Sequence, residues 1–223
     1  MAPTITPPRV PAHLEALDLA ALVFEDDMEL DAVRLTGAAP DAAVLGLELA
    51  AAELRDVDLG GARLPRLALR NCLVAGGNLA NVAVRGGSAE RTVFDHVRLT
   101  GLTWHEGVLR DVVLRGCRVD LASFASTRLE RVAFEDCVLT QADVQDARLA
   151  AVTFERCDLT GADLTGARFG AGCALRGCTL DGARGVEALR GVRMPYEDVL
   201  AAAVTFAGAL GIQVLDDDRD DAG

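Results

Sequence analysis

The chain carries an apolar residue at every fifth position between Leu54 and Phe169, 24 times without a break. Two positions before each of these residues lies a second column, which holds mostly Ala, Val, Cys and Gly. A step of five rotates a helical side chain by about 140° and moves a strand side chain to the opposite face. Neither an ordinary helix nor an ordinary strand can therefore bury this pattern.

A chain that turns a corner every five residues does bury both columns. If each corner is near 90°, four pentapeptides close a square coil of about 20 residues, and coils stack at the parallel-strand spacing of about 4.8 Å. We therefore predict an all-β fold, a quadrilateral parallel β-helix of about nine coils over residues 12–194. The Cys residues fall in the small inward column, so we interpret them as reduced core filler.

Three motifs, Ala142-Asp143-Val144, Cys157-Asp158-Leu159 and Ala162-Asp163-Leu164, resemble the A(D/N)Lxx signature of pentapeptide-repeat proteins. The resemblance implies a right-handed quadrilateral β-helix, and the right hand agrees with the general rule for parallel crossovers.

The pattern changes toward both ends of the predicted rod. We expect residues 1–11 to form an N-terminal cap or tail, in which Pro3, Pro7, Pro8 and Pro11 blunt the first strand edge. Residues 25–48 are predicted to be an irregular, loop-containing region, because Leu30, Leu35 and Leu45 come one position late. A one-residue slip is also predicted at residues 170–172.

A different pattern begins at Pro195 and predicts a C-terminal module over residues 195–215, followed by an acidic tail over residues 216–223. The module should contain one helix that ends at Gly211 and a short strand over residues 212–215. The helix is broadly apolar, so it either only caps the last coil or also pairs with a second copy in a homodimer. The candidate dimer-interface residues are Tyr196, Val199, Leu200, Val204, Phe206, Leu210, Ile212 and Val214.

The net charge of −12 is concentrated at the two ends of the chain. Residues 1–49 carry −7, residues 50–170 carry −1 and residues 171–223 carry −4. We expect no direct binding of nucleic acid, because it requires a basic stripe. No apolar run is long enough to span a membrane, and residues 1–11 lack the apolar segment of a signal peptide, so we expect a cytoplasmic protein.

Residues 20 apart should lie above one another on the outside of the rod. Two neighbouring columns then alternate in charge, which predicts an ion-pair lattice around the face of Leu69 and Leu129. Like charges stack elsewhere, and such stacks are either solvated positions or parts of a binding surface. The lattice residues are Arg70, Glu90, Arg110 and Glu130 beside Asn71, Arg91, Asp111 and Arg131. The like-charge stacks are Arg128, Arg148 and Arg168; Asp143 and Asp163; and Glu135 and Glu155.

Sequence motifs of catalysis are missing from the chain. Its three histidines, His13, His96 and His105, are not clustered with acids at metal-ligand spacing, and no phosphate-binding loop or nucleophile motif occurs. We therefore expect a protein that is not an enzyme and that holds no metal and no cofactor.

The repeats together with residues 196–214 resemble the branch of pentapeptide-repeat proteins that contains Qnr and MfpA. That resemblance implies a non-catalytic DNA mimic that binds DNA gyrase or topoisomerase IV and modulates it or protects it against quinolones or a toxin. The alternative is a structural or adaptor rod for an unknown protein partner. The candidate partner-binding residues are Glu25, Asp26, Asp27, Glu29, Asp31, Glu135, Asp143, Glu155 and Asp163.

Overall fold

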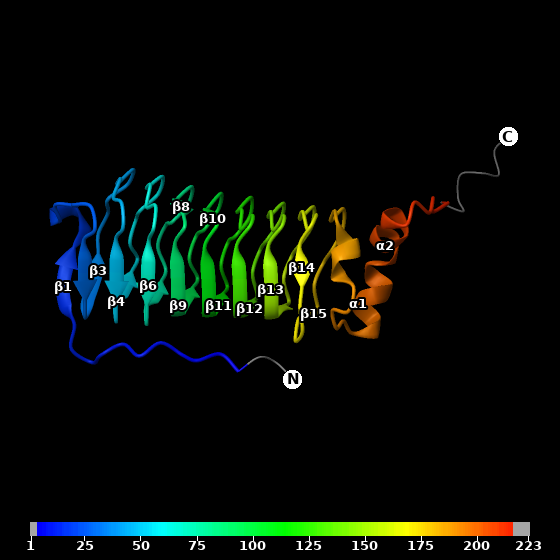
Figure 1. The fold of residues 1–223 in the computed structure, drawn as a ribbon, viewed down its shortest axis with the longest axis horizontal. Coiled ribbons are helices and arrows are strands. Elements are labelled where there is room, and N and C mark those ends of the chain that lie inside the picture. Colours follow the sequence, from blue (N-terminus) through cyan, green and yellow to red (C-terminus); the bar gives the residue numbers. More distant parts are fainter. Residues whose placement is uncertain (1–3, 216–223) are drawn as a thin grey trace.

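Short strands joined by tight corners occupy most of the chain and wind into an elongated coil (Figure 1). The computed structural model describes residues 4–215. Within them, every strand pairing is parallel, and nine strands stack along one face of the coil. Eight turns separate the first of these strands from the last, which corresponds to roughly 38 Å at the parallel-strand spacing. The predicted all-β parallel β-helix is confirmed.

The strands fall on successive faces of the coil. On the first face lie β2 (Glu29–Asp31), β4 (Glu48–Ala50), β6 (Ala68–Arg70) and β14 (Arg168–Phe169). On the second lie β1 (Glu15–Asp18), β3 (Val33–Thr36), β5 (Glu53–Arg55), β7 (Leu73–Ala75) and β15 (Ala174–Arg176). Four long strands span both faces: β9 (Ser88–Asp95), β11 (Val108–Arg115), β12 (Arg128–Glu135) and β13 (Arg148–Glu155). A third face carries β8 (Ala83–Arg85) and β10 (Thr103–His105), and single bridges connect the remaining coils.

A left-handed residue turns the chain at each corner. Positive φ recurs every five residues, for example at Asp56 (49°), Gly61 (74°) and Asn71 (54°). Gly, Asn and Asp reach this region most easily, which explains why they recur at these positions. Leu121 adopts the same conformation with φ of 58°, and its side chain is exposed.

The two inward columns form one continuous core. Leu129 and Val132 are fully buried, and the rings of Phe134 and Phe154 stack with centroids 4.8 Å apart. All six cysteines are buried and free, as predicted. Burial raises the pKa of Cys72 to about 11, so its thiol is neutral.

The predicted irregular region at residues 25–48 is wrong as a loop, but its one-residue register shift is confirmed, since Leu30 pairs with Leu49 and Leu35 with Leu54 at a step of 19. These residues form β2 and β3, and they bridge the next coil at Ala38 and Ala43. The chain loses a residue at one corner instead of gaining a loop: Leu35 aligns with Leu54, whereas Ala38 aligns with Asp58. The inward position is taken by Val44, which is buried, and not by Leu45.

Register changes by single residues occur at both ends of the rod. Leu17 pairs with Leu35, so the first coil contains 18 residues instead of 20. Beyond the slip at residues 170–172, Phe154 pairs with Leu175, a step of 21. The slip after Phe169 is therefore confirmed, and each corner can lose or gain one residue without interrupting the stack.

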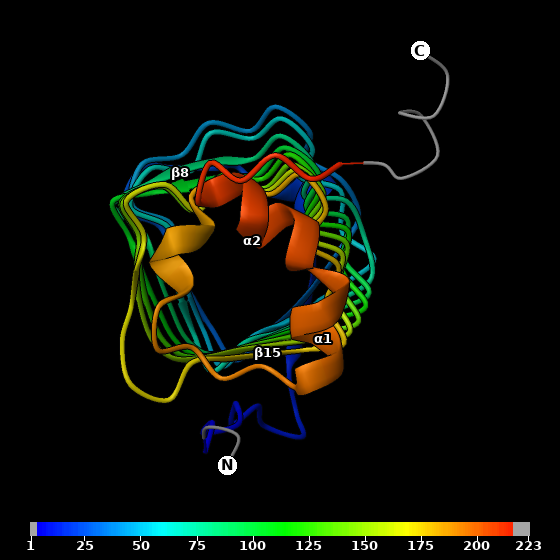
Figure 2. The ribbon, with the colours of Figure 1, turned by 90° about the vertical axis from the view of Figure 1, so that its right-hand side faces the viewer.

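Helical segments close the C-terminal end of the coil (Figure 2). They are the 3-10 helix η2 (Val186–Leu189) and the helices α1 (Tyr196–Ala201) and α2 (Ala203–Ala209). The predicted single helix is broken at Ala202, which is buried, and the two segments lie along adjacent sides of the four-sided opening. The helix stops at Gly211 as predicted, with φ of 75°. The predicted strand at residues 212–215 is absent from the described chain, because these residues have no strand beside them to pair with.

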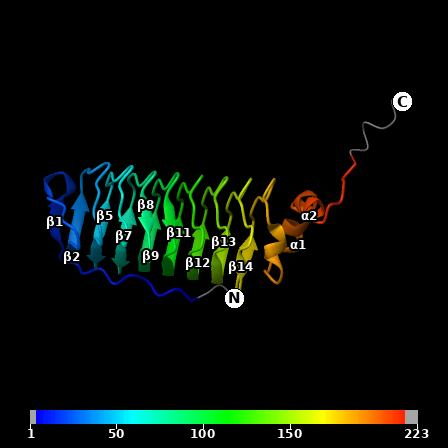
Figure 3. The same cartoon turned by 45° about the horizontal axis from the view of Figure 1, so that its top comes forward.

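Of the predicted N-terminal cap or tail, the structure shows a tail, and Pro3 lies outside the described residues. The extended residues preceding β1 fold back along the side of the rod instead of covering its end (Figures 1 and 3). The amide of Thr6 bonds Asp111, in a coil far from the first one. The first coil contains the 3-10 helix η1 (Leu19–Ala21), in which the amide of Ala20 donates to the Asp18 carboxylate at 3.0 Å.

The core makes a direct prediction about stability. Leu129→Ala removes a fully buried side chain and should destabilise the protein by about 2–5 kcal/mol in urea unfolding. Leu121→Ala is the matched control, because Leu121 is 57% exposed, and it should change stability by at most about 0.5 kcal/mol. Equal losses from the two substitutions would contradict the assignment of the inward column.

Candidate partner-binding surfaces

Five carboxylates predicted to bind a partner lie in the first coils and are all exposed. Two of them also support the local structure: Asp26 accepts the amide of Leu45 at 2.9 Å, and Asp27 pairs with Arg66 at 2.6 Å. The other three make no side-chain hydrogen bond or ion pair with the described residues; they are Glu25, Glu29 and Asp31. The N-terminal coils therefore present free negative charge.

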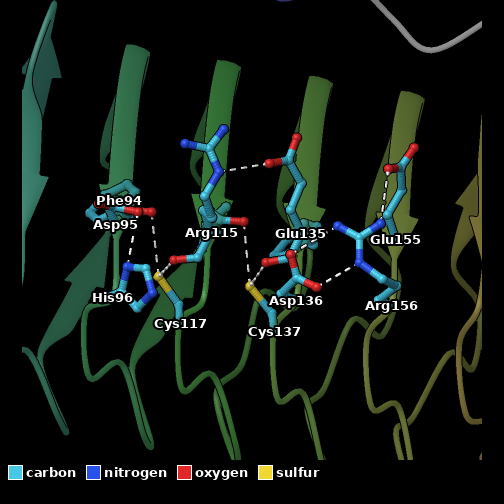
Figure 4. Close-up of polar contacts among 12 residues, drawn as sticks. Phe94, Asp95, His96, Arg115, Cys117, Glu135, Asp136, Cys137, Glu155 and Arg156 are labelled. Atoms are coloured by element: carbon cyan, nitrogen blue, oxygen red, sulfur yellow. Dashed lines mark hydrogen bonds and ion pairs between the residues drawn. The ribbon is translucent and has the colours of Figure 1, made fainter.

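Glu135 and Glu155 stack in register, but arginines neutralise them (Figure 4). Arg115 Nε donates to Glu135 at 2.9 Å, and Arg156 approaches Glu155 at 3.8 Å while it holds Asp136 at 2.6 Å. This part of the rod is a charge-paired surface instead of an acidic one.

Asp143 and Asp163 also stack as predicted, but on a different column from Glu135 and Glu155. Asp163 accepts hydrogen bonds from Arg184 (2.7 Å), Gln145 Nε2 (2.9 Å) and the amide of Thr165 (3.0 Å). Burial raises the pKa of Asp163, but hydrogen bonds from Thr165 and Gln145 and the charge of Arg184 outweigh burial and leave this pKa below its usual range. Its carboxylate is therefore part of the scaffold.

A short hydrogen-bond chain joins this column to His105, which the sequence did not place beside any acid. Ser123 Oγ donates to Asp143 at 2.8 Å and lies 2.8 Å from His105 Nε2. Because Asp143 accepts the one serine proton, His105 acts as the donor and cannot activate Ser123 as a nucleophile. In the sequence, the 20-residue spacing of Ser123 and Asp143 already indicated that these two residues stack. No group of three or more potential metal ligands occurs in residues 4–215.

The core has no room for a substrate. A narrow internal cavity of about 40 Å³ runs between the central leucines, and all of its lining side chains belong to Leu, Val, Phe and Trp residues. A site of this size without polar groups holds no reactive chemistry.

The C-terminal module exposes a group of apolar side chains at the end of the rod. Tyr196 is 76% exposed and Leu210 is 79% exposed. Phe206 differs, because it packs against the core. The exposed members of the predicted interface are Tyr196, Val199, Leu200, Val204, Leu210, Ile212 and Val214.

Three arginines form the predicted like-charge stack on the first face. Arg128, Arg148 and Arg168 are paired in register and line a shallow surface groove. Arg128 lies 3.9 Å from Glu130, whereas Arg148 and Arg168 form no ion pair among residues 4–215. The middle of the rod therefore also presents positive charge.

The comparisons with known proteins agree with this geometry. A family model described as a pentapeptide repeat region matches residues 88–164 and, in an overlapping match, residues 116–184. No curated protein sequence matches the chain.

Solved structures of similar fold come from several sources. HetL from the cyanobacterium Nostoc sp. strain PCC 7120, a protein involved in heterocyst differentiation regulation, is 17% identical, with 78% of this chain and 90% of HetL covered and a TM-score of 0.43. QnrB1, a plasmid-mediated fluoroquinolone resistance protein, is 17% identical over 92% of this chain and 100% of its own, with a TM-score of 0.38. A pentapeptide repeat protein from the Arabidopsis thaliana thylakoid lumen is 17% identical over 40% of this chain and 61% of its own, with a TM-score of 0.38. Likeness at these identities and TM-scores says nothing about what this protein binds.

The match to the family model extends over residues 88–184, and the same coil continues on both sides of them. No helix in residues 4–215 is both long and apolar enough to cross a membrane.

The bonded state of Asp163 makes stability depend on pH. The pKa of Asp163 is lowered in the folded protein. The stabilisation that its carboxylate provides is therefore complete above the ordinary pKa of 3.8 and is lost as the pH falls through the lowered pKa. Asp163→Asn should therefore destabilise the protein by about 1–2 kcal/mol at pH 7, and the difference from wild type should shrink below about pH 4. Glu29→Gln, at a free carboxylate, is the control, and urea unfolding at several pH values measures both. A difference that does not change with pH would contradict this assignment.

Proposed function

We propose that this protein is a non-catalytic homodimer that binds DNA gyrase or topoisomerase IV and modulates the enzyme or protects it against a quinolone or a toxin. The observation that carries the proposal is the exposed apolar C-terminal module, which lies at the opposite end of the rod from the acidic coils. The resemblance of residues 196–214 to the dimer module of the Qnr and MfpA branch supplies the partner.

Homodimer formation would cover the apolar side chains of the module. Contiguous apolar surface of this kind is rare on monomers and marks an interaction site. A twofold contact buries the same patch on both copies and leaves no apolar rod end in water. Residues 212–215, which have no strand partner within the described chain, would gain one in the second copy.

The dimer would place the acidic coils at its two outer ends. Residues 1–49 contain nine acidic residues and two arginines, and the exposed Glu25, Glu29 and Asp31 are free to meet a basic surface. A DNA-binding groove of a topoisomerase is such a surface, because it neutralises phosphates with Lys and Arg. DNA mimicry would rest on these end coils, since the charges of the middle coils are largely paired. The proposal also requires that the protein be located in the cytoplasm, where gyrase acts.

An adaptor rod for another protein is the second candidate. Arg148 and Arg168, which form no ion pair among residues 4–215, favour this candidate. A stack of positive charge would repel a basic DNA-binding groove. The two candidates differ in their effect on gyrase.

A supercoiling assay tests the gyrase proposal. The wild-type protein should inhibit gyrase supercoiling or reduce quinolone-stabilised cleavage, because its acidic ends compete with DNA. The triple variant Glu25→Gln, Glu29→Gln and Asp31→Asn should weaken that effect about tenfold or more, a loss of about 1.4 kcal/mol. Glu135→Gln with Glu155→Gln, at arginine-neutralised positions, should leave the effect within a factor of about three. No effect of the wild-type protein in either assay would exclude gyrase as the partner.

Light scattering tests the dimer separately. Leu210→Asp places a charge in the proposed interface and should give a folded monomer, because the side chain is 79% exposed in the single chain and its loss does not affect the core. Val23→Asp, at a residue 76% exposed near the other end, should remain a dimer. A wild-type protein that is monomeric at micromolar concentration, or a Leu210→Asp variant that keeps the dimer mass, would refute the interface.

A further inference from the structure

The N-terminal segment that leaves the end of the rod is bound to its side. Residues 4–10 run along the coils in the direction opposite to the winding of the chain (Figure 1). The amide of Thr6 donates to Asp111 Oδ1 at 3.2 Å, and the amide of Arg9 donates to Asn71 Oδ1 at 3.4 Å. The two residues between them are prolines, which have no N–H group. Every backbone donor from residue 6 to residue 9 is therefore hydrogen-bonded to the rod.

The spacing of the two acceptors matches one conformation of the segment. Asn71 and Asp111 lie two coils apart, since the residues before them pair through Glu90. Two coils correspond to about 9.6 Å. Three residues of polyproline II helix advance about 9.3 Å. One turn of this helix therefore spans the two acceptors.

The alternation of charge along this column produces that spacing. Arg91 occupies the coil between the acceptors and donates to Asn71 at 2.8 Å, and Arg131, one coil beyond Asp111, donates to Asp111 in two bonds of 2.7 Å. The predicted ion-pair lattice thus holds one acceptor in every second coil and fixes its orientation.

The face beside the acceptors is apolar on its outer side. Leu73, Val93, Val113 and Ala133 follow one another in register at outward positions. The equivalent positions on the first face include Arg128, Arg148 and Arg168, so an outward apolar column is not a general property of this coil.

The apolar residues of the segment lie against this column. Ile5 and Pro8 are half-buried and three residues apart, which is the repeat of polyproline II, whereas Thr6 and Pro7 are exposed. A surface pocket brings this part of the segment together with Val93 and Val113.

We propose that this outer face is a binding site for extended, proline-containing peptides, and that residues 4–10 occupy it in cis. The ligand class is a polyproline II segment with an apolar residue at every third position and an N–H on either side of a Pro-Pro pair. Such segments bind with a small loss of conformational entropy, because their backbone is already restrained. A partner that carries such a segment binds this site by displacing residues 4–10 of the protein itself.

Hydrogen exchange on the full-length protein tests occupation in cis. The amides of Thr6 and Arg9 should exchange at least tenfold more slowly than in the variant Ile5→Ser with Pro8→Ser, which removes the two half-buried contacts. Exchange of these amides at the rate of an unstructured peptide in the wild-type protein would overturn the proposal.

Peptide binding tests the ligand class. An acetylated, fluorescent peptide of residues 4–11 should bind the Ile5→Ser, Pro8→Ser protein at least tenfold more tightly than the wild type, whose own segment competes. Adding Val93→Ser and Val113→Ser to that protein should weaken binding at least tenfold, with the folded state checked by its thermal transition. A peptide with Gly-Gly in place of Pro-Pro should also bind at least tenfold more weakly. Failure to bind, equal binding to wild type and variant, or indifference to the two valine substitutions would each overturn the proposal.

Discussion

Hydrogen bonding between successive coils is the constraint on which the rest of the structure depends. Each pentapeptide pairs with the one a full turn later, so the backbone groups of a coil are satisfied only if the next coil repeats its corners. The left-handed residue at each corner turns the chain, and the inward apolar residue fills the centre. A missing or extra residue is absorbed at one corner, because the pairing resumes on the next face.

The same register organises the outer surface. Side chains one turn apart are held at the strand spacing, so chemistry repeated in the sequence becomes a column in space. Opposite charges produce the Asp111–Arg131 pair, like charges produce the stack of arginines, and apolar residues produce the column that includes Val93 and Val113. A scaffold of this kind can present several unrelated surfaces, since each outward column varies without effect on the core.

Functional differences within such a rod must come from departures from the repeat. The acidic first coils, the apolar C-terminal module and the returning N-terminal segment are three such departures among residues 4–215. They occupy different parts of the surface, so gyrase binding, dimerisation and peptide binding can be tested with separate substitutions. The internal cavity of the core is small, about 40 Å³, and only apolar residue types line it.

The sequence by itself determined the coil, the inward cysteines and the stacking of charges, because a strict period of 20 residues converts position in the chain into position in space. It also located the C-terminal helical region and its end at Gly211. Only the tertiary structure decided that Val44 and not Leu45 faces inward, that the helix breaks at Ala202 and that His105 meets Ser123. It alone placed Pro7 and Pro8 on the side of the rod. These features depend on contacts between segments that share no period, and a local pattern carries no information about which surface such a segment will cover.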